Sequence, residues 1–407
     1  MHELESLFSK YLETAPVFSN RDVLTISFTP ETIPHREMQI TALGRMLAPA
    51  LKGARPSNIF IYGRTGTGKT CVSRYVTEQL KKAAEKANVK IRVLYINCKM
   101  KRVADTEYRV LSQIINEFGV EVPFTGLPTD QLYQRFFDII DKEDQVIILI
   151  IDEIDVLVQR TGDEILYNIT RINQELKKAK LSIIGITNDL NFIERLDPRV
   201  KSSLSEEEMI FPPYNAVELQ DILRQRVCLA FLKDSIEEGV IEKCAALAAQ
   251  EHGDARRALD LLRVAAELAE REASQKVQLK HVDMAQEKID MDRIFEIVKS
   301  QPKQSQAVLW AICQLARQNP QKALAGEIKD VYTGDVFSLY EKICRGQRLK
   351  PLTHRRISDL IAELDMFGII TTSVVSKGRY GRTRTISLNI PEQVLIKLEG
   401  FLADIFR

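Results

Sequence analysis

The residues best suited to chemistry lie in a glycine-rich segment in the first part of the chain. Residues 63–70 read Gly-Arg-Thr-Gly-Thr-Gly-Lys-Thr and match the pattern G-x-x-x-x-G-K-[ST] in full. In this pattern backbone N–H groups surround phosphate oxygens, the lysine neutralises the β- and γ-phosphates, and the hydroxyl binds Mg²⁺. An apolar run precedes the segment and a helical pattern follows it, which is the required context. We predict that ATP or ADP with Mg²⁺ binds at Gly63, Gly66, Thr67, Gly68, Lys69 and Thr70.

Two carboxylates follow a second apolar run. Residues 147–151 are Ile-Ile-Leu-Ile-Ile, and Asp152 and Glu153 come next. Acids at a strand end are often only solvated, but these two accompany a phosphate-binding pattern earlier in the chain. We expect Asp152 to bind Mg²⁺, directly or through water, and Glu153 to polarise the attacking water.

Asn188 ends a third apolar run, residues 182–187. Its amide could hold the lytic water or a γ-phosphate oxygen, or it could simply form a turn. The phosphate loop, the acidic strand end and Asn188 together resemble the AAA+ ATPases, where they are called Walker A, Walker B and sensor 1. In that family a helical lid supplies sensor 2, and residues 253–256, Gly-Asp-Ala-Arg, have its GDxR form. The resemblance implies that Arg256 reaches the γ-phosphate; a solvated arginine at a helix start is the alternative.

These side chains need a sheet that brings the strand ends together. From about residue 56 to 212 short apolar runs alternate with longer amphipathic stretches, which predicts a parallel sheet with helices on both faces. The expected strands are residues 58–62, 92–97, 146–151 and 182–187. Residues 215 to about 289 are helical in pattern throughout, with apolar spacing at 240–249 and 256–269, and predict a separate lid.

The last part of the chain has the element order of a winged helix. Residues 292–302 lead into it, and residues 306–316, 338–345 and 353–367 read as helices, the third with Thr353 as N-cap and Gly368 as its end. Strands at 369–375 and 383–388 then flank the loop SKGRYGR. The predicted fold is α/β: an AAA+ parallel-sheet base with an N-terminal extension and a helical insert (1–213), an all-α lid (214–291) and a C-terminal winged-helix domain (292–407).

Charge is concentrated in this last domain. The net charge is +1, yet residues 345–384 hold nine lysines and arginines against three acids, which leaves about −5 elsewhere. Such asymmetry indicates a polyanion partner, and winged helices place a helix in the major groove of DNA and a hairpin tip in the minor groove. Expected contacts to double-stranded DNA are Thr353, His354, Arg355 and Arg356 on the helix, and Lys377, Gly378, Arg379, Tyr380 and Arg382 on the tip. A solvated loop is the other reading of the tip.

Several segments together resemble one AAA+ family over essentially the whole chain. The insert at 99–130, which contains EFGVEVPFTGLPTDQLY, the segments NIFIYGRTGTGKT and PHREMQI, and the winged-helix pattern resemble the archaeal replication initiators of the origin recognition complex and cell-division-cycle-six type. The resemblance implies origin binding, helicase loading, weak ATP hydrolysis used as a switch, and a replicative helicase and initiator paralogues as partners. The alternatives are an ATP-sensing transcription regulator and a clamp-loader or transposition-helper ATPase; the winged helix and the insert argue against the second.

The resemblance also implies roles for further residues. It places His35 and Arg36 against the base and ribose, Tyr214 beside the adenine and Arg226 near the nucleotide, although Tyr214 could equally be a packed aromatic. It implies that the insert touches DNA through Lys101, Arg102, Thr125 and Gly126. Arg199 is either an arginine finger for a neighbouring subunit or part of a salt bridge. Ser203 stands where eukaryotic relatives have a second arginine, which puts intersubunit hydrolysis in doubt.

Composition excludes several classes of protein. Hydrophobic residues make up 45% and charged residues 28% of the 407, and no run of 18 uncharged apolar residues occurs. The N-terminus has acids at positions 3 and 5 and no apolar core, so it is not a secretory signal. We expect a cytoplasmic, nucleoid-associated protein with no membrane partner. The six cysteines lie far apart without a CxxC pair, which predicts reduced, mostly buried residues and neither a zinc site nor disulfides.

Overall fold

The computed structural model describes residues 16–25, 28–99, 106–122, 128–204, 206–317, 331–376, 382–390 and 392–406. The chain divides into two compact units between Asp283 and Met284, and each is described by itself. No helix in these ranges is long and apolar enough to cross a membrane.

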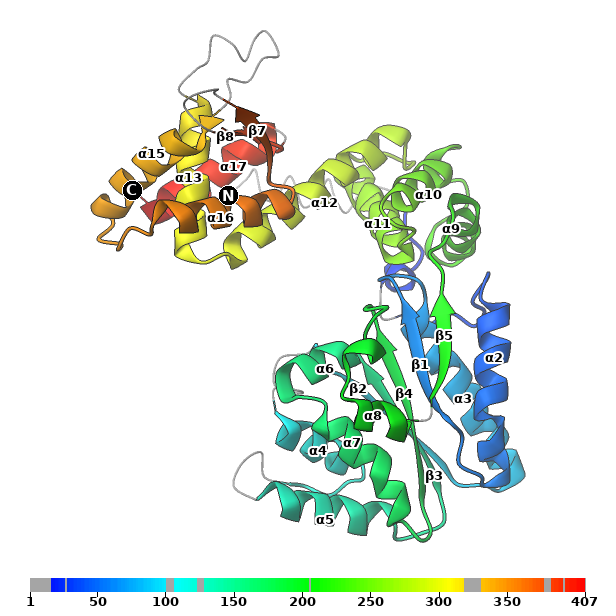
Figure 1. Ribbon diagram of the computed structural model, residues 1–407. Helices are drawn as coiled ribbons and strands as arrows, with labels where there is room; N and C mark the ends of the chain where they lie inside the picture. Colours follow the sequence, from blue (N-terminus) through cyan, green and yellow to red (C-terminus); the bar gives the residue numbers. More distant parts are fainter. Residues whose placement is uncertain are drawn as a thin grey trace. The chain divides into compact units, whose positions relative to one another are not determined.

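The first unit is built on a five-stranded parallel sheet in the order β2-β3-β4-β1-β5 (Figure 1). The strands are β1 (Asn58–Gly63), β2 (Ile91–Asn97), β3 (Val146–Asp152), β4 (Lys180–Thr187) and β5 (Glu206–Phe211). One face is covered by α2 (Glu37–Leu47) and α3 (Lys69–Ala87), and the other by α4 (Glu107–Asn116), α5 (Thr129–Ile140), α6 (Ile154–Thr161), α7 (Glu164–Arg171) and α8 (Pro198–Leu204). The predicted fold class is confirmed, and β5 is a strand that the sequence did not predict.

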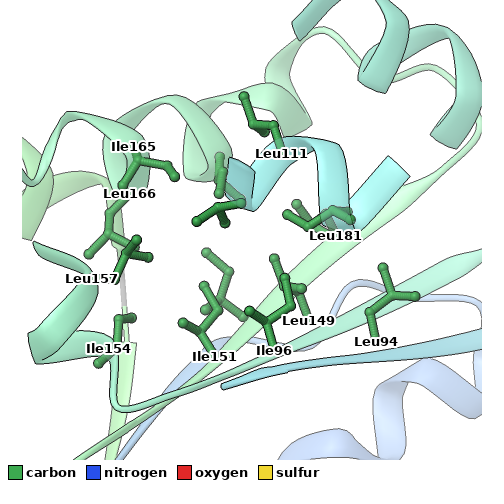
Figure 2. Packing of buried hydrophobic residues seen from close by; sticks show 14 of the residues in the cluster. Leu94, Ile96, Leu111, Leu149, Ile151, Ile154, Leu157, Ile165, Leu166 and Leu181 are labelled. Carbon is green, nitrogen blue, oxygen red and sulfur yellow. The ribbon is translucent and has the colours of Figure 1, made fainter. Parts of the chain in front are cut away.

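The sheet separates two hydrophobic cores because alternate residues of each strand point to opposite faces. In β3, Ile147, Leu149 and Ile151 pack with α4 to α8, while Ile148 and Ile150 pack against α2 and α3. Figure 2 shows the first core, where Leu149 and Ile151 lie with Leu94 and Ile96 of β2 beneath Leu111, Leu157 and Leu166. Every residue of β3 is buried, which explains its unbroken apolar run.

Helices α9 (Ala216–Ala230), α10 (Val240–Gln250) and α11 (Ala255–Arg271) form the lid. Asn215 starts α9 with a capping box to Glu218. The N-terminal segment packs on this lid: it carries η1 (Arg21–Leu24), Arg21 pairs with the buried carboxylate of Glu270, and the rings of Phe18 and Phe231 lie 5.0 Å apart.

Helix α12 (Leu279–Ser300) runs through residues 292–300, which the sequence led us to expect as a lead into the third domain. The division between compact units falls within this helix. The boundary expected between residues 291 and 292 therefore lies inside a continuous helix.

The second unit contains α13 (Lys303–Arg317), β6 (Val331–Tyr332), α15 (Thr333–Gly346), α16 (His354–Met366), β7 (Ile370–Ser376), β8 (Arg382–Leu388) and α17 (Glu392–Phe406). The three helices and the hairpin confirm the predicted winged-helix order, while β6 and α17 were not predicted. Strands β7 and β8 pair antiparallel, and β6 adds to the other side of β8. Thr353 caps α16 by accepting from Arg356 N at 3.4 Å, and Gly368 ends it with φ +73°.

Most of the cysteines are buried, as predicted. All six are free thiols, and Cys98, Cys244, Cys313 and Cys344 are buried. Within the described ranges no group of three or more histidine, cysteine or acidic side chains could hold a metal ion.

Candidate nucleotide-binding site and DNA-binding elements

A cavity of about 940 Å³ lies in the first unit where β1, β3 and β4 end. Parallel pairing brings these ends to one edge of the sheet: Tyr62 lies beside Thr187, and Asn97 lies beside Asp152. The cavity lining includes Lys69, Thr70, Asp152, Glu153, Asn188, Tyr214, Arg226 and Arg256. Predicted site residues as far apart in the sequence as Lys69 and Arg256 therefore line the same cavity.

Lys69 lines this cavity and makes three hydrogen bonds through its ammonium group. Its ammonium donates to the carbonyl oxygens of Gly63 (2.7 Å) and Arg64 (2.8 Å) and to Asn188 Oδ1 (2.8 Å). The residue is only 7% exposed. Burial lowers the pKa of Lys69 to about 8, although Asp152 and Glu153 favour its charged form. A phosphate close to this ammonium would favour its charged form further and raise the pKa again.

Asp152 is fixed by three donors. Its Oδ2 accepts from Thr70 Oγ1 at 2.8 Å and from Tyr95 Oη at 2.7 Å, and its Oδ1 accepts from Glu153 N at 3.1 Å. Hydroxyl and carboxylate oxygens side by side are the ligands that Mg²⁺ prefers. Tyr95 was not among the predicted residues; the ring of this β2 residue stacks under the guanidinium of Arg74 at 4.0 Å.

Asn188 joins the lysine to the second carboxylate. While its Oδ1 accepts from Lys69, its Nδ2 donates to Glu153 Oε2 at 2.9 Å. Glu153 itself has φ +57° and ψ +48°, a left-handed conformation that costs energy in a residue with a side chain. Such outliers concentrate at functional sites. The three residues form one hydrogen-bonded chain at the cavity wall.

The lid meets the phosphate loop directly. Ala255 N donates to Gly66 O at 3.2 Å, and a Cβ at Gly66 would lie 1.6 Å from Asp254 Oδ1, so only glycine fits there. Arg64 of the loop also lies 2.8 Å from His252 Nδ1 of the lid. Arg256 lies two residues after Asp254, which caps α11, and its exposed side chain lines the cavity; its contact with a γ-phosphate stays a prediction.

Arg36 and His35 do not line the cavity. Arg36 is 2% exposed and donates to Thr67 O (3.0 Å) and Pro212 O (2.6 Å), with its guanidinium 3.7 Å from the ring centroid of Tyr214. It supports the phosphate loop from behind, and burial lowers its pKa. His35 Nε2 lies 3.0 Å from a carboxylate oxygen of Asp221. A direct contact of either residue with base or ribose stays a prediction.

The N-terminal segment and α9 also line the cavity. This part of the lining includes Phe28, Ile33 and Ile222 with Arg226. Arg226 is 7% exposed, its guanidinium lies 4.6 Å from the ring centroid of Phe28, and its Nε has no hydrogen-bond acceptor among the described residues. An apolar slot with one orphaned donor fits a heterocyclic base. Nothing in the sequence pattern singled out Phe28 or Ile33.

Arg199 lies apart from the cavity at the start of α8. Its guanidinium donates to the two carboxylate oxygens of Asp197 at 3.1 and 3.2 Å, and its side chain is 82% exposed. Ser203 Oγ lies 3.1 Å from Thr170 Oγ1. The salt bridge considered for Arg199 is present, and a role in a neighbour's site stays a prediction.

The predicted DNA-binding residues are described only in part. Arg355 is exposed at the start of α16, Arg356 lies 3.7 and 3.8 Å from Asp359 and Glu363, and the ring of His354 packs against Phe337. Arg382 begins β8 opposite Ser376. Outside the described residues lie Lys101, Arg102, Thr125, Gly126, Lys377, Gly378, Arg379 and Tyr380.

Three stretches of the chain match known families. They are an AAA domain at residues 53–193, a Cdc6 AAA+ ATPase-type lid domain at 220–287, and a CDC6 C-terminal winged helix domain at 296–397. With the cavity above, they define an AAA+ ATPase that carries a Cdc6-type lid and a winged helix.

Relatives of nearly full length narrow this class. ORC1-type DNA replication proteins of Pyrococcus abyssi and Methanosarcina acetivorans are 54% and 51% identical, each over 95% of this chain and 91% of the relative. The Aeropyrum pernix ORC1 protein, solved in complex with DNA, has a TM-score of 0.80 and 42% identity over 96% of this chain and 98% of that one. The chain belongs to the family of ORC1-type DNA replication proteins. This confirms the resemblance and sets aside the clamp-loader alternative.

A more distant structure shares the fold. The Aeropyrum pernix ORC2 protein, solved in ADPNP–ADP complexes, has a TM-score of 0.60 at 21% identity over 96% of this chain and 99% of that one.

Proposed function

We propose that this chain binds duplex DNA at replication origins in an ATP-controlled manner, with slow hydrolysis as a switch. The observation that carries the nucleotide part is the single hydrogen-bonded chain of Lys69, Asn188 and Glu153 beside the Thr70–Asp152 pair, all facing one cavity. The observation that supports the DNA part is membership in a family of which one member, the Aeropyrum pernix ORC1 protein, was solved with DNA.

In the proposed mechanism each polar residue has a separate task toward ATP. Lys69 exchanges its carbonyl partners for phosphate oxygens, which favour its charged form. Glu153, oriented by Asn188, accepts the proton of the attacking water. Arg256 reaches the γ-phosphate from the lid, so the position of the lid depends on which nucleotide is bound.

The donor set beside Lys69 fits Mg²⁺. Thr70 Oγ1 and Asp152 Oδ2 lie 2.8 Å apart, and Tyr95 holds the carboxylate from the other side. Bound there, Mg²⁺ would neutralise charge on the phosphates during phosphoryl transfer. We assign Thr70 and Asp152 as its ligands.

Weak hydrolysis is supported by the surroundings of Arg199. Its guanidinium is engaged by Asp197 of the same chain, and the position of a second arginine in eukaryotic relatives is held by Ser203, bonded to Thr170. Arg199 would therefore have to leave Asp197 to reach a neighbouring subunit, and no arginine at position 203 would assist it. Such a protein suits a long-lived ATP state better than rapid turnover.

Membership in this family also suggests the DNA contacts, the protein partners and the cellular location of the chain. We propose that α16 and the β7–β8 hairpin contact origin DNA through Arg355, Arg379 and Arg382, and that the insert adds a second contact. The partners would be the replicative helicase and initiator paralogues, and the place the cytoplasm, on the nucleoid.

The nucleotide assignment is tested by substitution of Lys69. Equilibrium dialysis with labelled ATP should detect binding by the native chain and none by Lys69→Ala, while circular dichroism shows an unchanged fold. Lys52→Ala, an exposed lysine at the other edge of the sheet, is the matched control and should bind ATP normally. Equal ATP affinity in Lys69→Ala and the native chain would refute the assignment.

A further inference from the structure

The turn between α15 and α16 carries exposed cations that the proposed DNA contacts do not use. Arg345, Arg348 and Lys350 lie in or next to this turn, and Arg355 follows in the first turn of α16. Arg345 lies 3.9 Å from Glu341, at the limit of an ion pair. No carboxylate in the described part of the domain pairs with Arg348, Lys350 or Arg355. The turn is therefore a strongly positive surface.

This turn is held rigidly to the core of the second unit. The ring of Tyr340 is fully buried, and its hydroxyl donates to Gln304 Oε1 at 2.5 Å and accepts from Leu352 N at 3.1 Å. Gln304 Nε2 in turn donates to Lys350 O at 3.2 Å. The cations thus extend from a fixed backbone rather than from a solvated loop.

Arg348 is held in a conformation that disfavours arginine. Its φ is +55°, and Leu349 N donates to Cys344 O at 2.9 Å, the bond of a helix-ending motif that normally carries glycine at this place. Helix α16 ends with the same bond, from Ile369 N to Leu364 O, and there the left-handed residue is Gly368. Keeping arginine at the first of these positions costs stability, and a contact made by its guanidinium would offset that cost.

We propose that residues 345–350 form an additional surface for the phosphate backbone of duplex DNA, with Arg348 as its central contact. This inference rests on the proposed DNA binding. When the second helix of a helix-turn-helix lies in the major groove, the first crosses the backbone, so the turn between them meets phosphates. The guanidinium suits this ligand because it can donate two parallel hydrogen bonds to one phosphate. Such a contact adds affinity without sequence preference.

Arg348→Gly tests the surface because it should improve the fold while weakening binding. The probe is a fluorescein-labelled duplex of mixed sequence, titrated with the full chain between about 50 and 200 mM salt. We expect Arg348→Gly to unfold about 2 °C higher and to bind about fivefold more weakly, with a salt slope smaller by about 0.9.

The first unit offers a matched control for strain relief. Ala273 follows α11 with φ +57°, and Ser274 N donates to Ala269 O at 2.9 Å, the same motif without a cation. Ala273→Gly should also unfold at a higher temperature but bind the duplex like the native chain. Two further variants separate charge from conformation. Arg348→Lys should keep the native salt slope with an affinity between those of the native chain and Arg348→Gly, and Arg348→Asn should bind like the glycine variant.

The result that overturns the inference is native affinity and an unchanged salt slope in both Arg348→Gly and Arg348→Asn. The native chain would in that case still bind the duplex, and the proposed function would stand. Failure of the native chain to bind any duplex would instead refute the proposed DNA binding and this surface with it.

Discussion

Loss of the proton of Lys69 should by itself weaken ATP binding as the pH rises. Burial lowers the pKa of this lysine to about 8, and only the charged form can neutralise phosphate oxygens. With that pKa about nine-tenths of the lysine is protonated at pH 7 and about one-tenth at pH 9. The affinity for ATP should therefore fall about tenfold between pH 7 and pH 9. Near pH 9 Lys69 must take up one proton for each ATP that binds.

The stability of the free chain should change in the opposite direction. The unfolded lysine has the ordinary pKa of 10.5, so between about pH 8 and 10.5 the unfolded chain binds more protons than the folded one. The contribution of Lys69 to the free energy of unfolding should therefore become more favourable to the folded chain as the pH rises through that window. Binding and stability thus respond to the same proton with opposite signs.

Isothermal titration calorimetry in buffers of differing ionisation enthalpy measures both the affinity and the proton uptake. Lys69→Arg is the control, because its guanidinium stays charged throughout and any pH effect of ATP itself remains. Burial raises the pKa of the neighbouring Cys71, which keeps that thiol neutral in the window. Equal pH profiles for the native chain and Lys69→Arg would contradict the reasoning.

Three further variants test other parts of the account. Tyr95→Phe removes a hydroxyl donor from Asp152 and should raise the Mg²⁺ concentration needed for hydrolysis about tenfold, with ATP binding in EDTA unchanged; an unaltered Mg²⁺ titration would contradict this. Arg36→Met leaves the carbonyls of Thr67, which is buried, and Pro212 without this donor and should lower the free energy of unfolding by about 2 kcal/mol in urea titrations. Native stability in this variant would show that the support is dispensable. Arg379→Ala with Arg382→Ala should lower the salt slope of DNA binding by about 0.9 per lost phosphate contact, and an unchanged slope would make the hairpin tip a solvated loop.

The parts of the site that sequence could predict share one physical cause. Asp152 ends strand β3, Asn188 directly follows β4, and Lys69 follows the loop after β1; buried parallel strands are rich in apolar residues and end at one edge of the sheet. Their convergence is therefore implied as soon as the strands are recognised. Strand β5 was not predicted because Glu206, Glu207 and Glu208 interrupt its apolar pattern. This strand lies at the edge of the sheet.

The parts that sequence could not predict depend on contacts between distant segments. Tyr95 lies within a strand whose pattern indicates only core, and its bond to Asp152 exists because β2 and β3 are neighbours. Phe28 reaches the cavity because the N-terminal segment packs on the lid. The continuation of α12 to Ser300 could have been predicted, because no glycine or proline interrupts the sequence between Leu279 and Pro302.

The central claim, that this chain acts at replication origins, is tested most directly by immunoprecipitation of the protein from a synchronised culture of its host, with sequencing of the bound DNA. We predict one or a few sharp peaks that coincide with replication start points. Many peaks at promoters, unrelated to those points, would contradict the account and favour an ATP-sensing transcription regulator.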